Sequence, residues 1–235
     1  MTNPSPSPSL VSYELADGIA AIRMDDGKAN VMSEAMSQAL ASAFDRAESD
    51  RAVVLLTGRE RIFSAGYDLA LFKSPAAAIA RTLRAGGRLV ERILSFPYPV
   101  VAACSGHAVA QGAFVLLATD VRFGPEGDFK FGLNEVAIGL TIPYYGVETA
   151  RLRLAPSWFN HATLTGTLYG PHDAKTAGFL DAVYPHAEVV TRAREEAQRL
   201  TKLDMNAHAG TKLRVRGPAL AKLREGHEQE YPATV

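Results

Sequence analysis

The chain of 235 residues is poor in cysteine and has no excess charge of either sign. A single cysteine, Cys104, excludes an intrachain disulfide framework and a cysteine-rich metal site. The 25 basic and 25 acidic side chains cancel, which leaves no broad basic field for nucleic acid or an anionic membrane. No stretch approaches the roughly 18–20 uncharged apolar residues of a membrane span. We therefore expect no nucleic-acid partner and no membrane partner.

Targeting and ligand-binding signals are also missing. The start, "MTNPSPSPS", lacks the basic and apolar regions of a secretion signal, so we expect a disordered leader over 1–9 and a cytoplasmic location. No G-x-x-x-x-G-K-[ST] is present, and no G-x-G-x-x-G follows a strand, which excludes the common phosphate loops. The histidines are scattered without ligand spacing, so no metal is expected. Cys104 and His107 are interpreted as structural.

Segments typical of strands alternate with segments typical of helices. The short apolar runs "AVVLLTG" and "YPVVAACSG" predict strands buried on both faces. Apolar residues at helical spacing predict helices over 33–50 and 76–96, the second with a weak point at Gly86-Gly87. A final, marginal helix is expected over 218–232. The alternation favours one α/β domain of stacked β–β–α units, with a mostly helical end that covers the core or mediates oligomer contacts.

Two segments, "FSAGYDL" and "SGHAVAQGAFVLLA", place small residues immediately before a predicted helix. A helix N-terminus leaves backbone N–H groups unsatisfied and carries partial positive charge. If two such ends converge, their N–H groups can hold one developing oxyanion. Either segment alone is a weak indication, because most glycine-containing turns before helices are only turns.

A third segment, "FKFGLNEVAIGLTIPYYG", places Glu135 among apolar and aromatic residues. A carboxyl group there loses solvent, which raises its pKa towards the range of a general base. The pattern alone also fits a glutamate that faces solvent from a short amphipathic element.

The runs "RIFSAGYDL", "PYPVVAACSGHAVAQGAFVLLATDVRF" and "FKFGLNEVAIGLTIP" together resemble the crotonase (enoyl-CoA hydratase/isomerase) superfamily. The resemblance implies a crotonase-like α/β fold of repeated ββα units, usually assembled as a homotrimer or a dimer of trimers. It implies an acyl-CoA thioester as substrate, with coenzyme A as part of that substrate and no separate cofactor. We divide the chain into a core over 10–195 and a C-terminal helical segment over 196–235.

The resemblance also implies roles for backbone groups. The N–H groups of Tyr67 and Gln111 would hold the thioester oxygen as an oxyanion hole. The family usually has glycine at the second position, and Gln111 keeps the N–H but not the conformational freedom of glycine. A turn that needs a positive φ there would strain Gln111. The CoA-binding segments would contain Lys28, Ala29, Ser64, Ala65 and Gly66.

The reaction is indicated by a departure from the hydratase pattern. Members that resemble hydratases carry two glutamates, and here Phe114 occupies one of those positions. The remaining carboxylate, Glu135, is enough to move a proton from C2 to C4 of a 3-enoyl thioester. Asn134 before the glutamate and the aromatic pair after it resemble the Δ3,Δ2-enoyl-CoA isomerase branch. We predict an isomerase with an acyl pocket formed by Phe114, Tyr144 and Tyr145.

Two other functions remain open at this point. The chain fits an enoyl-CoA hydratase or related lyase that uses an unrecognised second acid. It also fits a non-catalytic acyl-CoA-binding protein, because Gln111 replaces the usual glycine.

Overall fold

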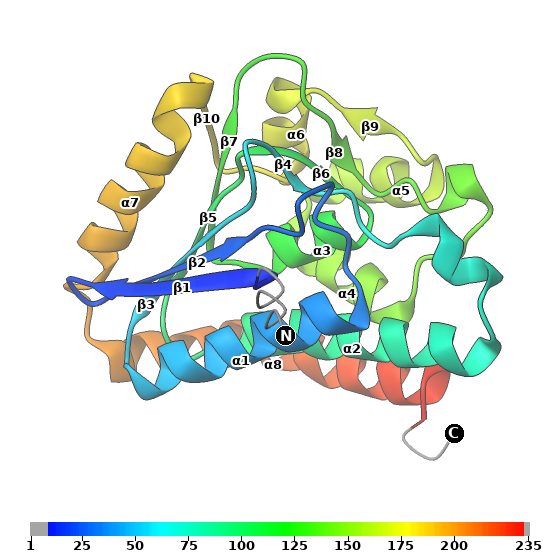
Figure 1. Cartoon of the computed structure of the whole chain (residues 1–235), viewed down its shortest axis with the longest axis horizontal. Helices are drawn as coiled ribbons and strands as arrows, with labels where there is room; N and C mark the ends of the chain where they lie inside the picture. Colours follow the sequence, from blue (N-terminus) through cyan, green and yellow to red (C-terminus); the bar gives the residue numbers. More distant parts are fainter. Residues whose placement is uncertain (1–8, 233–235) are drawn as a thin grey trace, which may run out of the picture.

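The computed structural model describes residues 9–232, so residues 1–8 of the expected leader lie outside the described part. Strands and helices follow one another in a repeating order (Figure 1). The strands are β1 (Val11–Ala16), β2 (Ile19–Met24), β3 (Val53–Thr57), β4 (Arg61–Ser64), β5 (Val100–Ala103), β6 (Gly106–Val109), β7 (Val121–Pro125), β8 (Phe131–Gly132), β9 (Leu168–Tyr169) and β10 (Ala182–Tyr184). The α-helices are α1 (Glu34–Ser49), α2 (Ala76–Ser95), α3 (Gln111–Ala118), α4 (Tyr144–Arg153), α5 (Pro156–Leu164), α6 (Pro171–Ala177), α7 (Val189–Leu200) and α8 (Met205–Glu230). In the described part of the chain, three 3-10 helices complete the order: η1 (Leu69–Lys73), η2 (Val136–Ile138) and η3 (His186–Glu188).

The strands form two sheets. Six strands pair in the order β1-β2-β3-β5-β7-β10, and four pair in the order β4-β6-β8-β9. All neighbours are parallel except the β1–β2 and β8–β9 pairs. The chain contains three successive ββα units: β3-β4-α2, β5-β6-α3 and β7-β8-α4. In each unit the first strand belongs to the larger sheet and the second strand belongs to the smaller one. The predicted α/β fold of repeated ββα units is confirmed.

The larger sheet is covered on both faces, which explains its continuous apolar runs. In β3, Val54 and Leu56 belong to the main core, which also contains apolar residues of α1, α2 and α3. Val53 and Leu55 point the other way and pack against α7. A parallel strand between two helical layers cannot alternate apolar with polar residues, because both of its faces are buried.

The smaller sheet positions the candidate site. Strands β4, β6 and β8 are parallel neighbours, with Ser64 opposite Ala108 and Ala108 opposite Phe131. The carboxyl ends of parallel strands meet at one edge of a sheet, where ligands bind in many α/β proteins. The three segments that the sequence singled out therefore emerge side by side.

The C-terminal helix differs from the expectation. A helix covers nearly all of the predicted range 218–232, but the predicted start is wrong, because α8 is one continuous helix that passes through Pro218. It runs along α2 and packs against both α2 and α4 (Figure 1). Pro218 lies on the exposed side of the helix, whereas Leu220 and Leu223 are buried in the main core. Packing of this apolar face outweighs the local cost of the proline.

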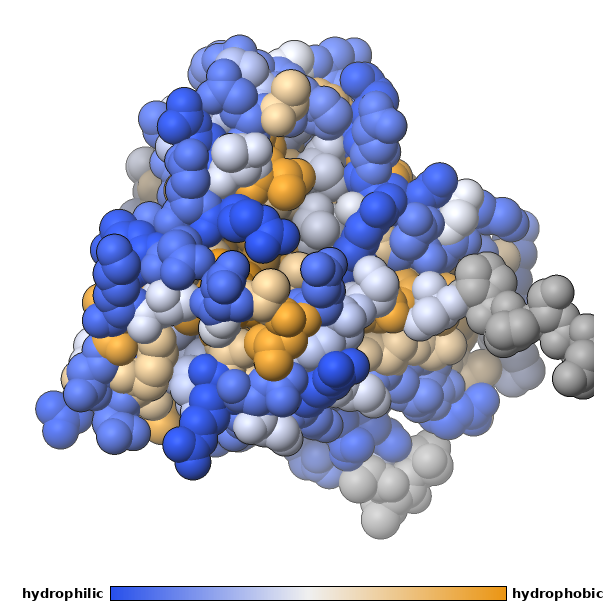
Figure 2. All heavy atoms as spheres, turned by 60° about the vertical axis from the view of Figure 1, so that its left-hand side comes forward, coloured by the Kyte–Doolittle hydropathy of each residue, from blue (hydrophilic) through white to orange (hydrophobic). Residues whose placement is uncertain are grey.

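The surface is mainly hydrophilic on the face that Figure 2 shows, where hydrophobic residues form small groups between hydrophilic ones. Across residues 9–232 no helix is both long enough and apolar enough to span a membrane. The division of the chain at residues 195 and 196, the homotrimer and the cytoplasmic location stay predictions.

Candidate active site

The turns that follow β4 and β6 are pressed against each other. Gly66 has a φ of +84°, and a Cβ added there would lie 2.8 Å from the Ala110 Cβ and 3.2 Å from the Gln111 nitrogen. A Cβ at Gly112 would lie 2.5 Å from the Ser64 carbonyl oxygen. Glycine at both positions lets the two backbones approach this closely. The structure therefore brings together the two turns on which the oxyanion-hole prediction depends.

The unusual backbone conformation of the second turn falls on Ala110 and not on Gln111. Ala110 has φ 52° and ψ −126°, a region that strongly favours glycine. Gln111 is the first residue of α3, and its φ is not positive. The condition under which glutamine would be strained is therefore not met, because the positive φ lies one residue earlier.

The two predicted donors have free backbone amides. Within residues 9–232, neither the N–H of Tyr67 nor that of Gln111 donates a hydrogen bond to a protein acceptor. For Gln111 the reason is its place in the first turn of α3, where helical N–H groups have no partner in the helix. Two unsatisfied amides on adjoining turns meet one requirement of an oxyanion hole, which is that its donors are not already used within the protein.

Glu135 follows β8 and immediately precedes η2. Its exposed fraction is 7%, and its Oε2 atom has no hydrogen-bond partner in the described part of the chain. Burial raises the pKa of its carboxyl group to about 7. The glutamate is therefore buried, as the apolar context indicated, and the alternative of a solvent-facing residue is wrong. At neutral pH a large fraction of this carboxyl is ionised and able to accept a proton.

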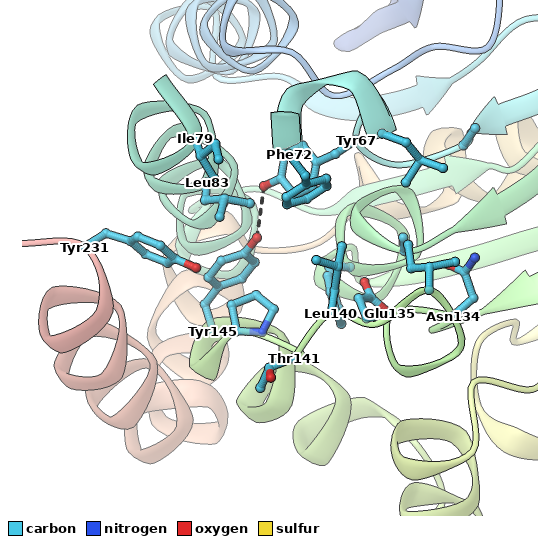
Figure 3. Close-up of a pocket in the computed structure, with 16 residues that line it drawn as sticks. Tyr67, Phe72, Ile79, Leu83, Asn134, Glu135, Leu140, Thr141, Tyr145 and Tyr231 are labelled. Carbon is cyan, nitrogen blue, oxygen red and sulfur yellow. Dashed lines mark hydrogen bonds between the residues drawn. The ribbon is translucent and has the colours of Figure 1, made fainter. Parts of the chain in front are cut away.

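An apolar cavity of about 340 Å³ joins the turns to the glutamate (Figure 3). Tyr67, Ala110 and Glu135 line it, and so does Phe114 from α3. Phe114 is 1% exposed, and its ring lies so close to α4 that a Cβ at Gly146 would approach it to 2.6 Å. Among the described residues that line this cavity, Glu135 alone carries a carboxylate.

The aromatic pair at the start of α4 divides between the cavity and the surface. Tyr145 is fully buried and lines the cavity, 6.0 Å from the Phe114 ring in an edge-to-face arrangement. Tyr144 is 53% exposed, and its Cβ packs against Gly226 of α8. The prediction that Tyr144 lines the acyl pocket is wrong. Consecutive helical residues point about 100° apart, so only one of the two can face the cavity.

The expected CoA-binding segments lie against the first turn. The Ala65 N–H donates to the Ala29 carbonyl at 3.0 Å, and the Ser64 hydroxyl donates to the Asn30 carbonyl at 2.7 Å. Lys28 is exposed at the outer end of the same loop, and its carbonyl accepts a hydrogen bond from Arg59. The residues are thus assembled on one side of the site, whereas their contact with coenzyme A stays a prediction.

The sequence analysis missed part of the cavity wall. Leu69 and Phe72 come from η1, Ile79 and Leu83 from α2, and Tyr231 from the end of α8. The helical spacing of Ile79 and Leu83 marks a buried face but does not distinguish a cavity wall from ordinary core. Nothing in the sequence near Tyr231 relates it to segments more than 80 residues away.

Cys104 and His107 have the structural roles that the sequence indicated. Cys104 is fully buried, and burial raises the pKa of its thiol to about 12, which leaves little nucleophilic thiolate at neutral pH. The Nδ1 atom of His107 accepts a hydrogen bond from the Lys130 N–H at 3.0 Å. Among residues 9–232 no group of three or more His, Cys, Asp or Glu side chains is placed to hold a metal ion.

Comparison with known proteins agrees with this fold. The sequence model of the enoyl-CoA hydratase/isomerase family matches residues 14–232. The chain belongs to the enoyl-CoA hydratase/isomerase family. The solved structure of a member of this family from Pseudomonas syringae is 44% identical, with a TM-score of 0.93, over 96% of this chain and 98% of that one.

Two further solved structures of the family carry different activities in their names. An enoyl-CoA isomerase of Mycobacterium tuberculosis is 42% identical, with a TM-score of 0.91 over 94% of this chain and 97% of its own. An enoyl-CoA hydratase of Mycobacterium marinum is 41% identical, with a TM-score of 0.90 over 94% of this chain and 99% of its own. Overall similarity therefore does not separate isomerisation from hydration in this family member, and the site residues must carry that distinction.

Proposed function

We propose that this enoyl-CoA hydratase/isomerase family member converts 3-enoyl-CoA thioesters into 2-enoyl-CoA thioesters. One observation carries the proposal: among the described residues, Glu135 supplies the sole carboxylate of the cavity, and Phe114 lies where the hydratase pattern has a second one. Adding water to a double bond needs a group that activates the water and a group that manages the proton. Moving a double bond needs one group that takes a proton and returns it.

The proton path follows from the position of Glu135. The carboxylate removes a proton from C2, and the electrons pass into a dienolate whose negative charge lies largely on the thioester oxygen. The N–H groups of Tyr67 and Gln111 would stabilise this charge. Glu135 then returns the same proton to C4, which leaves the double bond between C2 and C3. The apolar cavity and Phe114 keep water from capturing the intermediate.

The raised pKa of Glu135 gives the proposal a pH dependence. A base must be ionised in the free enzyme, so kcat/KM should fall as the pH drops below about 7, the pKa of this carboxyl. Above that value the rate should level off. A glutamate of ordinary pKa would place the decline more than two pH units lower.

Activity assays with 3-enoyl-CoA and 2-enoyl-CoA test the proposal. We expect isomerisation of the first and little hydration of the second. Glu135→Gln should lower isomerisation by about 100-fold or more, with binding of the CoA ester retained. Glu126→Gln, which alters an exposed glutamate, is the matched control and should leave the rate unchanged. Strong hydration without isomerisation, or undiminished turnover of Glu135→Gln, would overturn the proposal.

Hydration is the second candidate, and the name of the M. marinum relative favours it. It would require a second acid that the described cavity wall lacks. The same assay decides between them, and binding of CoA esters without any turnover would instead indicate a non-catalytic protein.

A further inference from the structure

Hydrogen bonds join the side chains of the two candidate oxyanion-hole residues, Tyr67 and Gln111, through that of Tyr145. The Tyr145 hydroxyl donates to the Gln111 Oε1 atom at 2.8 Å, and the Gln111 Nε2 atom donates to the Gly86 carbonyl at 3.1 Å. The Tyr67 and Tyr145 hydroxyls lie 2.9 Å apart and point toward one another (Figure 3). Gln111 and Tyr145 are fully buried. The side chain of one candidate donor residue is thus connected to that of the other through a single hydroxyl.

The direction of each hydrogen bond is fixed by chemistry. A backbone carbonyl only accepts, so the Gln111 amide must turn its nitrogen to Gly86 and its oxygen to Tyr145. The Tyr145 hydrogen is then committed to Gln111, and Tyr67 must be the donor in the contact between the two hydroxyls. Neither hydroxyl retains a hydrogen for the substrate, which argues against a role as a proton donor. The chain of bonds can position other groups but not protonate the substrate.

Helix α2 is shaped to receive this arrangement. A Cβ at Gly86 would lie 1.9 Å from the Tyr67 hydroxyl oxygen and 2.9 Å from the Gln111 Nε2 atom. A Cβ at Gly87 would lie 2.4 Å from the His227 ring and 2.9 Å from the Tyr145 ring. Each glycine inside a helix costs about 1 kcal/mol relative to alanine, so the pair is unfavourable for α2 alone. The two glycines that the sequence marks as a weak point make room for the linked side chains and for His227.

We propose that Tyr145 is a positioning residue that holds the Tyr67 and Gln111 backbone amides in register as one oxyanion hole. The inference rests on the proposed use of these amides to bind a thioester oxygen. Glycine is the usual residue at the second donor position, and Gln111 adds a side chain that anchors the turn to α2 and α4. Donors that are fixed before the reaction stabilise the developing charge more strongly than donors that must reorganise.

Tyr145→Phe tests the inference because it removes the linking hydroxyl and keeps the ring. The ring stays packed between Phe114 and His227, whose centroids lie 6.0 Å and 5.7 Å away. We expect kcat for isomerisation to fall about tenfold or more, with KM almost unchanged. Tyr144→Phe alters an exposed neighbour of the same type and should change neither constant.

A spectroscopic measurement separates positioning from general packing. In bound crotonyl-CoA, the infrared stretch of the thioester carbonyl reports how strongly the two amides polarise it. We expect the shift of this band to lower frequency to be smaller in Tyr145→Phe than in the unaltered chain. This readout needs no turnover, so it tests the inference even if the chain does not isomerise 3-enoyl-CoA.

Gln111→Met provides an independent variant that keeps the backbone N–H and removes both side-chain hydrogen bonds. It should reproduce the loss in kcat and in carbonyl shift, and it carries the test if Tyr145→Phe does not fold. The double variant should be little worse than either single one, because both break the same connection. A normal carbonyl shift in a folded single variant, or losses that multiply in the double variant, would overturn the inference.

Discussion

Glu135 combines a buried carboxyl group with an oxygen that has no partner in the described structure. In the unfolded chain this carboxyl would titrate near its ordinary pKa of 4.5, and burial raises the pKa to about 7 in the folded chain. A raised pKa means that the folded state prefers the protonated form. The stabilising effect of that preference is present below pH 4.5 and is lost as the pH rises through 7.

Glu135→Gln should therefore stabilise the protein in a pH-dependent way. The shift from 4.5 to about 7 corresponds to a cost on the order of 3 kcal/mol once the carboxyl is ionised. Relative to the unaltered chain, the variant should gain up to that amount of unfolding free energy between pH 4.5 and pH 8.5. Urea unfolding at both pH values measures the change. An equal effect of the substitution at both values would show that the buried charge is not its cause.

Single residues show how far sequence reasoning reaches. Glu135 stands out as a carboxylate among apolar residues, whereas the importance of Phe114 follows from the resemblance to hydratases, which carry a glutamate at its position. The prediction that Tyr144 lines the cavity is wrong because the residue at which α4 begins decides which of two adjacent tyrosines faces inward. A sequence pattern does not fix that residue. The positive φ that would strain Gln111 falls on Ala110 instead, because the local geometry of a turn is not encoded in residue type alone.

At the scale of elements, α8 is held to the core by a buried cluster of charges. Asp120 follows α3 and binds the Lys212 Nζ atom at 2.7 Å and the Arg216 guanidinium at 2.8 Å. Burial by itself would raise the pKa of Asp120, but the two cations outweigh it and hold the pKa below its usual value. Sequence patterns around Asp120 do not reveal these partners, because they lie more than 90 residues away in α8.

Asp120→Asn should loosen α8. The substitution leaves two largely buried cations without their carboxylate, and breaking a buried ion pair from one side costs about 3–5 kcal/mol. We expect that loss in urea unfolding at pH 7, together with faster amide hydrogen exchange along α8. Asp128→Asn is the matched control, since Asp128 is 90% exposed in its pair with Lys130 and should contribute less than about 1 kcal/mol. A similar, small loss in both variants would mean that the cluster does not anchor the helix.

At the scale of the molecule, the cavity is closed by segments from distant parts of the chain. The turn after β4, helix α2, helix α3 and the loop before α4 meet there, and Tyr231 covers one side from the end of α8. Arg84 of α2 holds this end in place, because its Nε atom donates to the Tyr231 carbonyl at 3.0 Å. The order of strands and helices was predictable from local patterns, but a wall assembled across the whole chain was not.

Tyr231→Ala should shift the preference for acyl chain length if the chain acts on enoyl-CoA thioesters. Removing the ring enlarges the cavity on the side that α8 closes, so longer apolar chains gain space and shorter ones lose contact. We expect the ratio of kcat/KM for a long-chain over a short-chain 3-enoyl-CoA to rise about tenfold, since a few apolar contacts are worth 1–3 kcal/mol. Tyr144→Ala removes an equal side chain that also packs on α8 but lies outside the cavity, and it should leave the ratio unchanged. A uniform loss for all chain lengths in Tyr231→Ala would indicate that the residue stabilises α8 without bounding the acyl chain.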